Sequence, residues 1–328
     1  MFRKLWKTIK ILGILIIILI CLPHSILPKQ ISGSRSGDIE EYIKLNESEA
    51  RLSEYKDDTE ALKLKLAQLE VINTSRKKFR AQPVELDILA SRVANKMCAE
   101  AAKNDYVGHW NLAGEKPYQR YSSAGGFDHV SENAFGEWTT GEYKISSSTI
   151  LSMMKTGHGT FMAERAPNDG HKKTIIDKYH NYVGIGYFLS EKQFRYYEEF
   201  IDRYLEFENI PSEVKVDESF KITIKPLGNE YPYYMVVYRE KAPKSMTPAQ
   251  IKRLSSYADF TDEQFLRYTA WELSEFKSGD KYNIPLEFSK EGFYYIHIYL
   301  DPKEITKPAS LNTKGRTPAS GIVISARN

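Results

Sequence analysis

Tyr182-Val-Gly-Ile-Gly-Tyr-Phe188 and Phe194-Arg-Tyr-Tyr197, two runs near the middle of the 328-residue chain, decide the fold class. Both are rich in β-branched and aromatic residues, which predicts two strands. Gly184 and Gly186 lie within the first run and lack the third glycine of a dinucleotide-binding loop. We therefore interpret these glycines as positions where the strand packs closely against a neighbouring element.

Helices are predicted before these strands. Apolar residues at the spacing of one helix face predict a helix that ends near Arg80, and they are Leu62, Leu66, Leu69 and Ile72. Pro83 suits the first residue of a second helix, whose buried face would carry Leu86, Ala90, Val93 and Met97. Residues 147–163 predict a third helix, whereas residues 104–145 are rich in Gly, Ser and Asn and predict long loops. Residues 62–208 are therefore predicted to form one α+β domain.

The pattern changes after Asn209-Ile-Pro211, where short alternating runs predict strands separated by turns. The candidate strands are Phe220–Lys225, Tyr233–Tyr238, Tyr282–Phe288, Phe293–Leu300 and Gly321–Ser325. A helix is predicted near Thr247–Ser256, with Thr247 as its cap and Pro248 in its first turn. Residues 209–328 are thus predicted to form a small all-β, sandwich-like domain.

The first thirty residues predict a targeting segment. They contain five basic residues and no acidic residue, and the apolar run Ile11–Leu22 follows the basic start. This order is typical of a secretory signal peptide, and an uncleaved N-terminal membrane anchor fits it equally well. Residues 31–61 are predicted to be a polar linker with a solvated helix. Both alternatives place the rest of the chain outside the cytoplasm, secreted or anchored.

Charge and cysteine content exclude several classes of protein. The formal net charge of the whole chain is only +3, too small for a nucleic-acid-binding surface. Two cysteines cannot build a disulfide framework or a cysteine-rich zinc module. Cys21 lies in the apolar run, so one cysteine, Cys98, remains beyond the targeting segment. We interpret Cys98 as a buried small side chain, because no basic residue is placed to activate it.

Four residues of the loop-rich region and its flanks carry the side chains most suited to chemistry. They are His109, Glu132, Glu164 and His171. Two imidazoles and two carboxylates in one cleft could bind a divalent metal or act as general acids and bases. Their spacing alone favours a simpler interpretation, in which they are separate residues making ordinary hydrogen bonds.

The order of several short motifs resembles the CAP superfamily, which is named after cysteine-rich secretory proteins, antigen 5 and pathogenesis-related protein 1. Its domain is also called the SCP domain, and the bacterial, cysteine-poor branch is the most similar. In chain order the motifs are Leu69–Arg76, the helix predicted over Pro83–Ala102, Tyr106-Val-Gly-His109, Ser131-Glu-Asn-Ala134, Gly170-His-Lys-Lys-Thr-Ile-Ile176 and Tyr182-Val-Gly-Ile-Gly186.

The resemblance implies an α-β-α sandwich with a cleft that holds two histidines and two acidic residues. His109 matches the first family histidine, Glu132 the glutamate of the Glu-Asn motif, and His171 the second histidine. Glu164 matches the second acid, although the helix before it lacks the family's tryptophan, and His158 competes for a place in the same stretch. Asn133 is expected to support the cleft by pinning its loop through hydrogen bonds.

The same resemblance implies an extracytoplasmic protein that binds a ligand without catalysis. The expected partners are a lipid, a glycan or another extracellular protein, with membrane association through the N-terminal segment. The alternative is a metal-assisted, peptidase-like hydrolase, in which His109 and His171 hold a zinc ion. No cofactor is required by the first hypothesis, and no enzymatic activity is assigned.

Overall fold

A computed structural model describes residues 38–254, 256–257 and 263–328. The described residues belong to one compact unit. The predicted signal peptide or membrane anchor over residues 1–30 lies outside the described residues. Within the part of the chain that is described, no helix is both long enough and apolar enough to cross a membrane.

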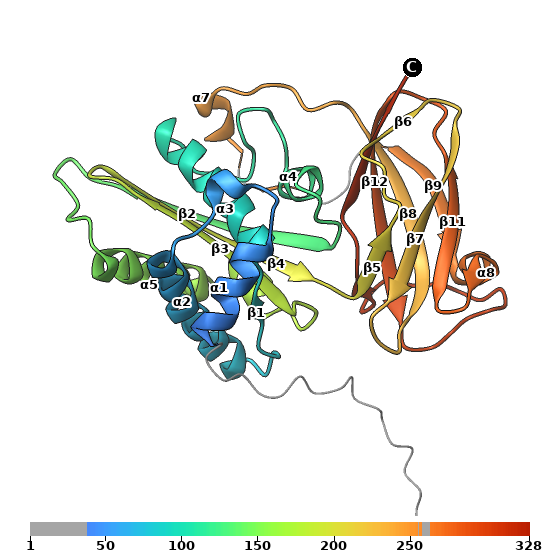
Figure 1. The fold of residues 1–328 in the computed structure, drawn as a ribbon, viewed down its shortest axis with the longest axis horizontal. Helices are drawn as coiled ribbons and strands as arrows, with labels where there is room; N and C mark the ends of the chain where they lie inside the picture. The colour runs from blue at the N-terminus through green and yellow to red at the C-terminus, as the bar shows by residue number, and fades with distance from the viewer. Residues whose placement is uncertain (1–37, 255, 258–262) are drawn as a thin grey trace, which may run out of the picture. The chain divides into compact units, whose positions relative to one another are not determined.

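A four-stranded sheet forms the centre of the first part of the chain, with the order β1-β3-β4-β2 (Figure 1). Its strands are β1 (Glu85–Leu86), β2 (His129–Trp138), β3 (Tyr182–Leu189) and β4 (Gln193–Asp202). β2, β3 and β4 pair in antiparallel fashion, and β1 pairs with β3 in parallel. β2 therefore forms one edge of this sheet. The two strands predicted from the central sequence run are confirmed.

Helix α3 (Ile88–Lys103) covers one face of this sheet at unusually short range. A Cβ atom added at Gly184 would lie 2.5 Å from the Cβ of Ala90, and one at Gly186 equally close to that of Ala94. No side chain fits at either position, so the prediction that these glycines permit close packing is confirmed. Cys98 of this helix is fully buried, as predicted.

The other face is covered by α2 (Thr59–Lys78), α5 (Ser147–Ala163) and α6 (Gly170–Ile176). Their apolar side chains share one core with the sheet, among them Leu62, Leu69, Ile72, Met154, Phe161, Ile185 and Phe200. Helix α1 (Ile39–Ser48) adds Tyr42, whose hydroxyl accepts a hydrogen bond from the Leu86 amide. The helix predicted as solvated in this region thus buries one side on the core.

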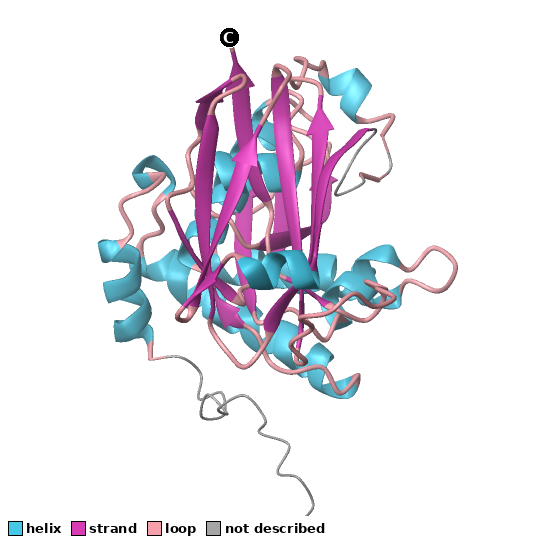
Figure 2. Ribbon diagram, turned by 90° about the vertical axis from the view of Figure 1, so that its right-hand side faces the viewer, coloured by secondary structure: helices cyan, strands magenta, loops and turns pink. Residues whose placement is uncertain are grey.

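Two further sheets form the C-terminal part (Figure 2, which views the protein from their side). One has the order β10-β11-β7-β5 and the other β6-β14-β12-β8-β9, with β13 paired to β12. Their bounds are β5 (Leu205–Glu208), β6 (Glu213–Lys215), β7 (Ser219–Pro226), β8 (Tyr231–Glu240), β9 (Glu263–Thr269), β10 (Lys277–Ser278), β11 (Lys281–Glu287), β12 (Gly292–Asp301), β13 (Thr317–Pro318) and β14 (Ile322–Arg327). A shared apolar core that includes Ile222, Ile284, Met235 and Ile296 joins the two sheets.

The predicted mixture of helices and strands is confirmed, whereas the four domain ranges predicted from the sequence stay predictions. Strand β5 lies inside the range predicted for the first domain and pairs with β7 of the C-terminal part. The smaller helical elements are η1 (Ser53–Tyr55), α4 (Pro117–Ser123), α7 (Pro248–Ile251) and α8 (Ala270–Glu275).

Three local predictions were wrong. The second helix begins after Asp87, whose carboxylate caps it, because Glu85–Leu86 forms strand β1 and pairs with β3. Residues 104–145 contain helix α4 and strand β2 as well as loops, since the alternation in β2 is masked by its polar residues. The helix after Thr247 ends at Ile251, earlier than predicted, although Thr247 does cap it.

Candidate functional site

His109 and Glu132 form a buried hydrogen-bonded pair. His109 lies in the loop that follows α3, and Glu132 lies on the edge strand β2. The Nδ1 atom of His109 is 2.7 Å from Oε1 of Glu132. The side chain of His109 is 11 % exposed and that of Glu132 is fully buried. A buried carboxylate needs compensation by donors or positive charge, and here one more residue supplies it.

Arg120 of helix α4 supplies that compensation. Its guanidinium pairs with the second carboxylate oxygen of Glu132 and donates a 2.6 Å hydrogen bond to the backbone carbonyl of His109. One side chain therefore fixes both members of the pair. Arg120 is not predicted from the sequence as a site residue, although Pro117 marks the start of a helix that would carry it.

A second buried acid, Glu199, faces Glu132 directly across the β2–β4 ladder. Its carboxylate lies 3.7 Å from the Arg120 guanidinium, and neither of its oxygens accepts a hydrogen bond within the described part of the chain. Burial, reinforced by the negative charge of Glu132, raises the pKa of Glu199 well above its usual range. Of the two carboxylates, Glu199 is therefore the one driven more strongly toward the neutral form. Burial also raises the pKa of Glu132, but Arg120 opposes this and favours its charged form.

The electrostatics also determine the state of His109. Burial, followed by the positive charge of Arg120, lowers the pKa of His109 to about 4. The imidazole is thus neutral at neutral pH, and its Nδ1–H donates to the Glu132 carboxylate. The lone pair is then on Nε2, for which no hydrogen-bond partner is found among the described residues.

His171 and Glu164 form a second pair, which is more exposed. Nδ1 of His171 lies 2.5 Å from Oε1 of Glu164, and the second carboxylate oxygen accepts from the backbone amides of His171 and Lys172 at 3.0 and 3.4 Å. Glu164 therefore also stabilises the start of α6. The His171 ring stacks on Phe161 at 4.8 Å, and the two polar side chains are 34 % and 23 % exposed.

The two pairs are neighbours. The ring centroids of His109 and His171 are 6.4 Å apart. The four side chains selected from the sequence thus lie together as two His–carboxylate pairs, which we call the buried pair (His109 and Glu132) and the exposed pair (His171 and Glu164).

Asn133 and His158 have positions that differ from their predicted ones. Asn133 lies in β2 rather than in a loop, and its amide donates to the carbonyl of His171 at 3.2 Å and to Glu198 at 3.1 Å. It therefore anchors the backbone of His171 in the exposed pair to strand β2. Both ring nitrogens of His158 are already engaged, by Glu198 at 2.8 Å and by Ser75 at 2.9 Å. His158 thus has a buried structural role here.

A residue from the C-terminal part of the chain completes the surroundings. Tyr257 places its ring 4.8 Å from that of His109, and its hydroxyl accepts a 2.9 Å hydrogen bond from the Glu132 amide. That amide belongs to the edge strand, where an unpaired N–H needs a partner. The chain reaches this place because Ile251 of α7 is buried against Tyr106 and Tyr197. Nothing in the local sequence of residues 241–257 predicts this contact.

The described residues do not form a complete metal site. Both histidines turn Nδ1 to a carboxylate and leave Nε2 free to bind a metal, as metal-bound histidines commonly do. A catalytic zinc site needs three protein ligands. Among the residues that the structure describes, however, no group of three or more His, Cys, Asp or Glu side chains is placed to hold an ion. The two nitrogens alone therefore do not fit such a centre.

Comparisons with known proteins bear on fold only weakly. No family model matches the chain, and no curated protein matches it. Among solved structures, an extracellular protein containing an SCP domain from Bacillus anthracis is 17 % identical over 42 % of this chain and 39 % of its own, with a TM-score of 0.32. An outer surface protein from Borrelia burgdorferi is 16 % identical over 42 % of this chain and 93 % of its own, also with a TM-score of 0.32.

A cysteine-rich secretory protein from Staphylococcus aureus is 14 % identical over 42 % of this chain and 38 % of its own, with a TM-score of 0.27. The chain thus spans well under half of the Bacillus and Staphylococcus structures. Because these identities and TM-scores are low, any functional interpretation has to rest on the residues of this chain.

Proposed function

We propose that this chain is an extracytoplasmic CAP-domain protein that uses its two His–Glu pairs to bind a ligand, and that it does so without catalysis. The layering of α3 and of α2, α5 and α6 on opposite faces of one sheet supports the α-β-α sandwich of that domain. The C-terminal sheets would form the attached β-sandwich. The basic and apolar N-terminal segment supports export and membrane association.

The observation that carries the proposal is the adjacency of the two pairs, with ring centroids 6.4 Å apart, after their residues were selected from sequence motifs alone. Glu132 already accepts hydrogen bonds from His109 and Arg120. These bonds fix its carboxylate in place, so we assign it a structural role in the site and not that of a base that exchanges protons. The exposed pair, whose two side chains are both partly accessible, is the part that a ligand can reach. The ligand class is a lipid, a glycan or an extracellular protein.

The test is binding by the full-length chain and by His171→Ala. Lipid vesicles, a glycan panel and extracellular extracts serve as ligand sources, and Lys173→Ala is the matched control. Lys173 lies on the same helix, and its side chain is 66 % exposed. We expect His171→Ala to weaken binding about tenfold or more, because it removes a central polar contact. Equal binding by the wild type and His171→Ala would refute the role of the pairs.

The second candidate is the metal-assisted hydrolase, which would need a ligand beyond the two histidine nitrogens to complete a catalytic zinc site. One observation favours it. Neither Nε2 atom of His109 or His171 has a hydrogen-bond partner within the described part of the chain. Zinc titration of the full-length chain by calorimetry, followed by a peptide-cleavage assay, separates the two proposals. Tight zinc binding that is lost in His171→Ala, together with zinc-dependent cleavage, would favour the hydrolase over the binding protein.

A further inference from the structure

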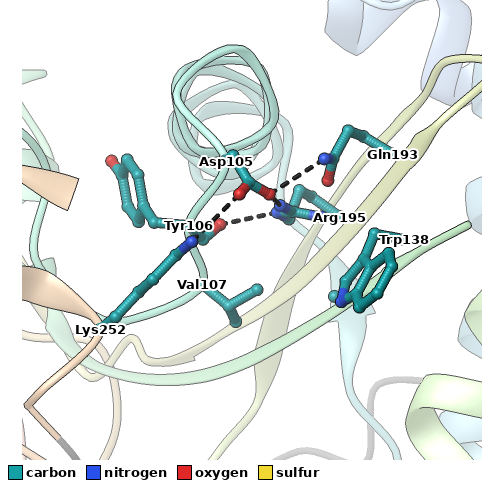
Figure 3. A pocket seen from close by; sticks show the side chains of 8 residues that line it. Asp105, Tyr106, Val107, Trp138, Gln193, Arg195 and Lys252 are labelled. Carbon is teal, nitrogen blue, oxygen red and sulfur yellow. Dashed lines mark hydrogen bonds and ion pairs between the residues drawn. The ribbon is translucent and has the colours of Figure 1, made fainter. Parts of the chain in front are cut away.

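A cavity of about 490 Å³ lies apart from the two His–Glu pairs (Figure 3). Its lining includes Asp105, Val107, Trp138, Gln193, Arg195 and Lys252, and none of the four paired residues. The volume is in the range of small-molecule sites, which combine aromatic or apolar walls with a few fixed polar groups. Both features are present here, and neither has a part in the function proposed above.

The fixed polar group is the carboxylate of Asp105. Helix α3 ends at Lys103, and Asp105 follows with a left-handed φ of 50° while the Tyr106 amide bonds back to the Ala101 carbonyl. This is a Schellman-type helix end, in which Asp is tolerated. The turn aims the Asp105 carboxylate at three donors, Gln193 at 2.9 Å, Lys252 at 3.1 Å and Arg195 at 3.4 Å.

The rear of the cavity is rigid because Arg195 is held on all sides. Its side chain is 2 % exposed and donates to the backbone carbonyls of Tyr106, Phe194 and Glu137 at 2.7, 2.8 and 3.2 Å. The polar groups at the mouth are accessible by contrast. The side chains of Asp105 and Lys252 are 62 % and 49 % exposed.

The apolar wall is Trp138, which is 69 % exposed at the end of the edge strand β2. In Figure 3 its indole lies on one side of Val107 and the stem of Lys252 on the other. Gly136 also lines the cavity, two residues earlier on the same face of the strand, and its lack of a side chain leaves room there. A Cβ atom there would lie 2.4 Å from a methyl carbon of Val107. An exposed indole beside fixed charged groups leaves a large apolar face without a protein partner among the described residues.

We propose that this cavity is a saccharide-binding site. The face of a sugar ring carries C–H groups that pack on the Trp138 indole, while its rim carries hydroxyls that both donate and accept. Asp105 accepts from such hydroxyls and Lys252 donates to them, while the Gln193 amide holds the Asp105 carboxylate in place. The two cations and one anion give the site a slight positive charge, so saccharides that carry a carboxylate bind more tightly than neutral ones.

The test uses the full-length chain and a panel of neutral and uronic-acid oligosaccharides, with binding followed by calorimetry and tryptophan fluorescence. We expect Trp138→Ala to weaken saccharide binding about tenfold or more, as loss of a buried aromatic anchor does. Trp138→Phe retains part of the affinity, because the smaller ring still offers a stacking face. Leu227→Ala is the control, since Leu227 is 49 % exposed and lies in the C-terminal part outside the cavity.

Three results would overturn this assignment. The first is a wild-type chain that binds no saccharide of the panel at millimolar concentration. The second is Trp138→Ala binding as well as the wild type, with circular dichroism showing that both are folded. The third is binding of acidic peptides at this cavity without any saccharide, which would replace the ligand class. None of these results affects the outcome of the His171→Ala test. The proposal for this cavity and the proposal for the His–Glu pairs can therefore be refuted independently.

Discussion

The buried pair and the exposed pair use the same chemistry in different surroundings. Each joins a histidine Nδ1 to a glutamate oxygen, at 2.7 Å in the buried pair and 2.5 Å in the exposed pair. The first pair is enclosed by Arg120, Glu199 and Tyr257, and the second is 34 % and 23 % exposed. One pair therefore contributes to the stability of the fold, while the other remains available to a ligand. Changes to the buried pair and its neighbours should therefore cost more stability than changes to the exposed pair.

Loss of Arg120 should destabilise the protein most. Arg120→Ala leaves the buried Glu132 without its cation, and removing one partner of a buried ion pair costs about 3–5 kcal/mol. Urea unfolding of the full-length chain measures the loss. Lys173→Ala, which breaks the exposed ion pair with Asp169, should cost no more than about 1 kcal/mol. Similar losses in the two variants would show that the buried network does not stabilise the fold.

Mild acid should destabilise the protein through His109 of the buried pair. The pKa of His109 is lowered from 6.5 to about 4, so between these values the unfolded chain binds more protons than the folded chain. The free energy of unfolding therefore falls as the pH falls through this window. At about 1.4 kcal/mol for each pKa unit, the total loss is roughly 3 kcal/mol.

The measurement compares urea unfolding of the wild type and of His109→Gln at several pH values in that window. His109→Gln lacks the titrating group, so its stability should change less than that of the wild type as the pH falls. The remaining histidines and carboxylates are common to both proteins and cancel in the comparison. Parallel pH profiles for the two proteins would mean that burial does not hold His109 neutral.

The hydroxyl of Tyr257 should have a smaller effect on the same pair. Tyr257→Phe leaves the Glu132 amide on the edge strand without its 2.9 Å acceptor, at a cost of about 1–2 kcal/mol. Thermal unfolding measures the change. Tyr55→Phe is a suitable control, because no side-chain hydrogen bond is found for the Tyr55 hydroxyl among the described residues. No difference between the two variants would mean that water satisfies that amide equally well.

The sequence predicted the members of the pairs better than it predicted their surroundings. The members of the pairs lie in short motifs that follow one another in a fixed order, and such an order can be recognised directly in the sequence. They are His109, Glu132, Glu164 and His171. Arg120 and Glu199 reach Glu132 from a short helix and from the neighbouring strand, so their role depends on tertiary contacts. A usable signal did exist for Glu199, because alternation in β4 places the adjacent acids Glu198 and Glu199 on opposite faces of the sheet.

Tyr257 shows the limit of local prediction most clearly. It lies 148 positions after the histidine whose ring it contacts, on a segment between two strands of the other sheets. Its placement depends on Ile251, which is fully buried against residues of the first part of the chain. Helix α7 was predicted from its own cap, Thr247. Where a correctly predicted helix docks is decided by complementary packing that no periodicity or motif encodes.

The exposed pair should tolerate change best, and Glu164→Gln tests it. The amide oxygen of glutamine can still accept from the backbone amides of His171 and Lys172, so the start of α6 keeps its cap. The substitution removes the negative charge beside His171, and the interaction of these two partly exposed side chains is worth about 0.5 kcal/mol. Urea unfolding measures this change against Glu191→Gln, an exposed position on the loop before β4. A loss as large as that of Arg120→Ala would show that the exposed pair also holds the fold together, and the division of roles between the two pairs would then be wrong.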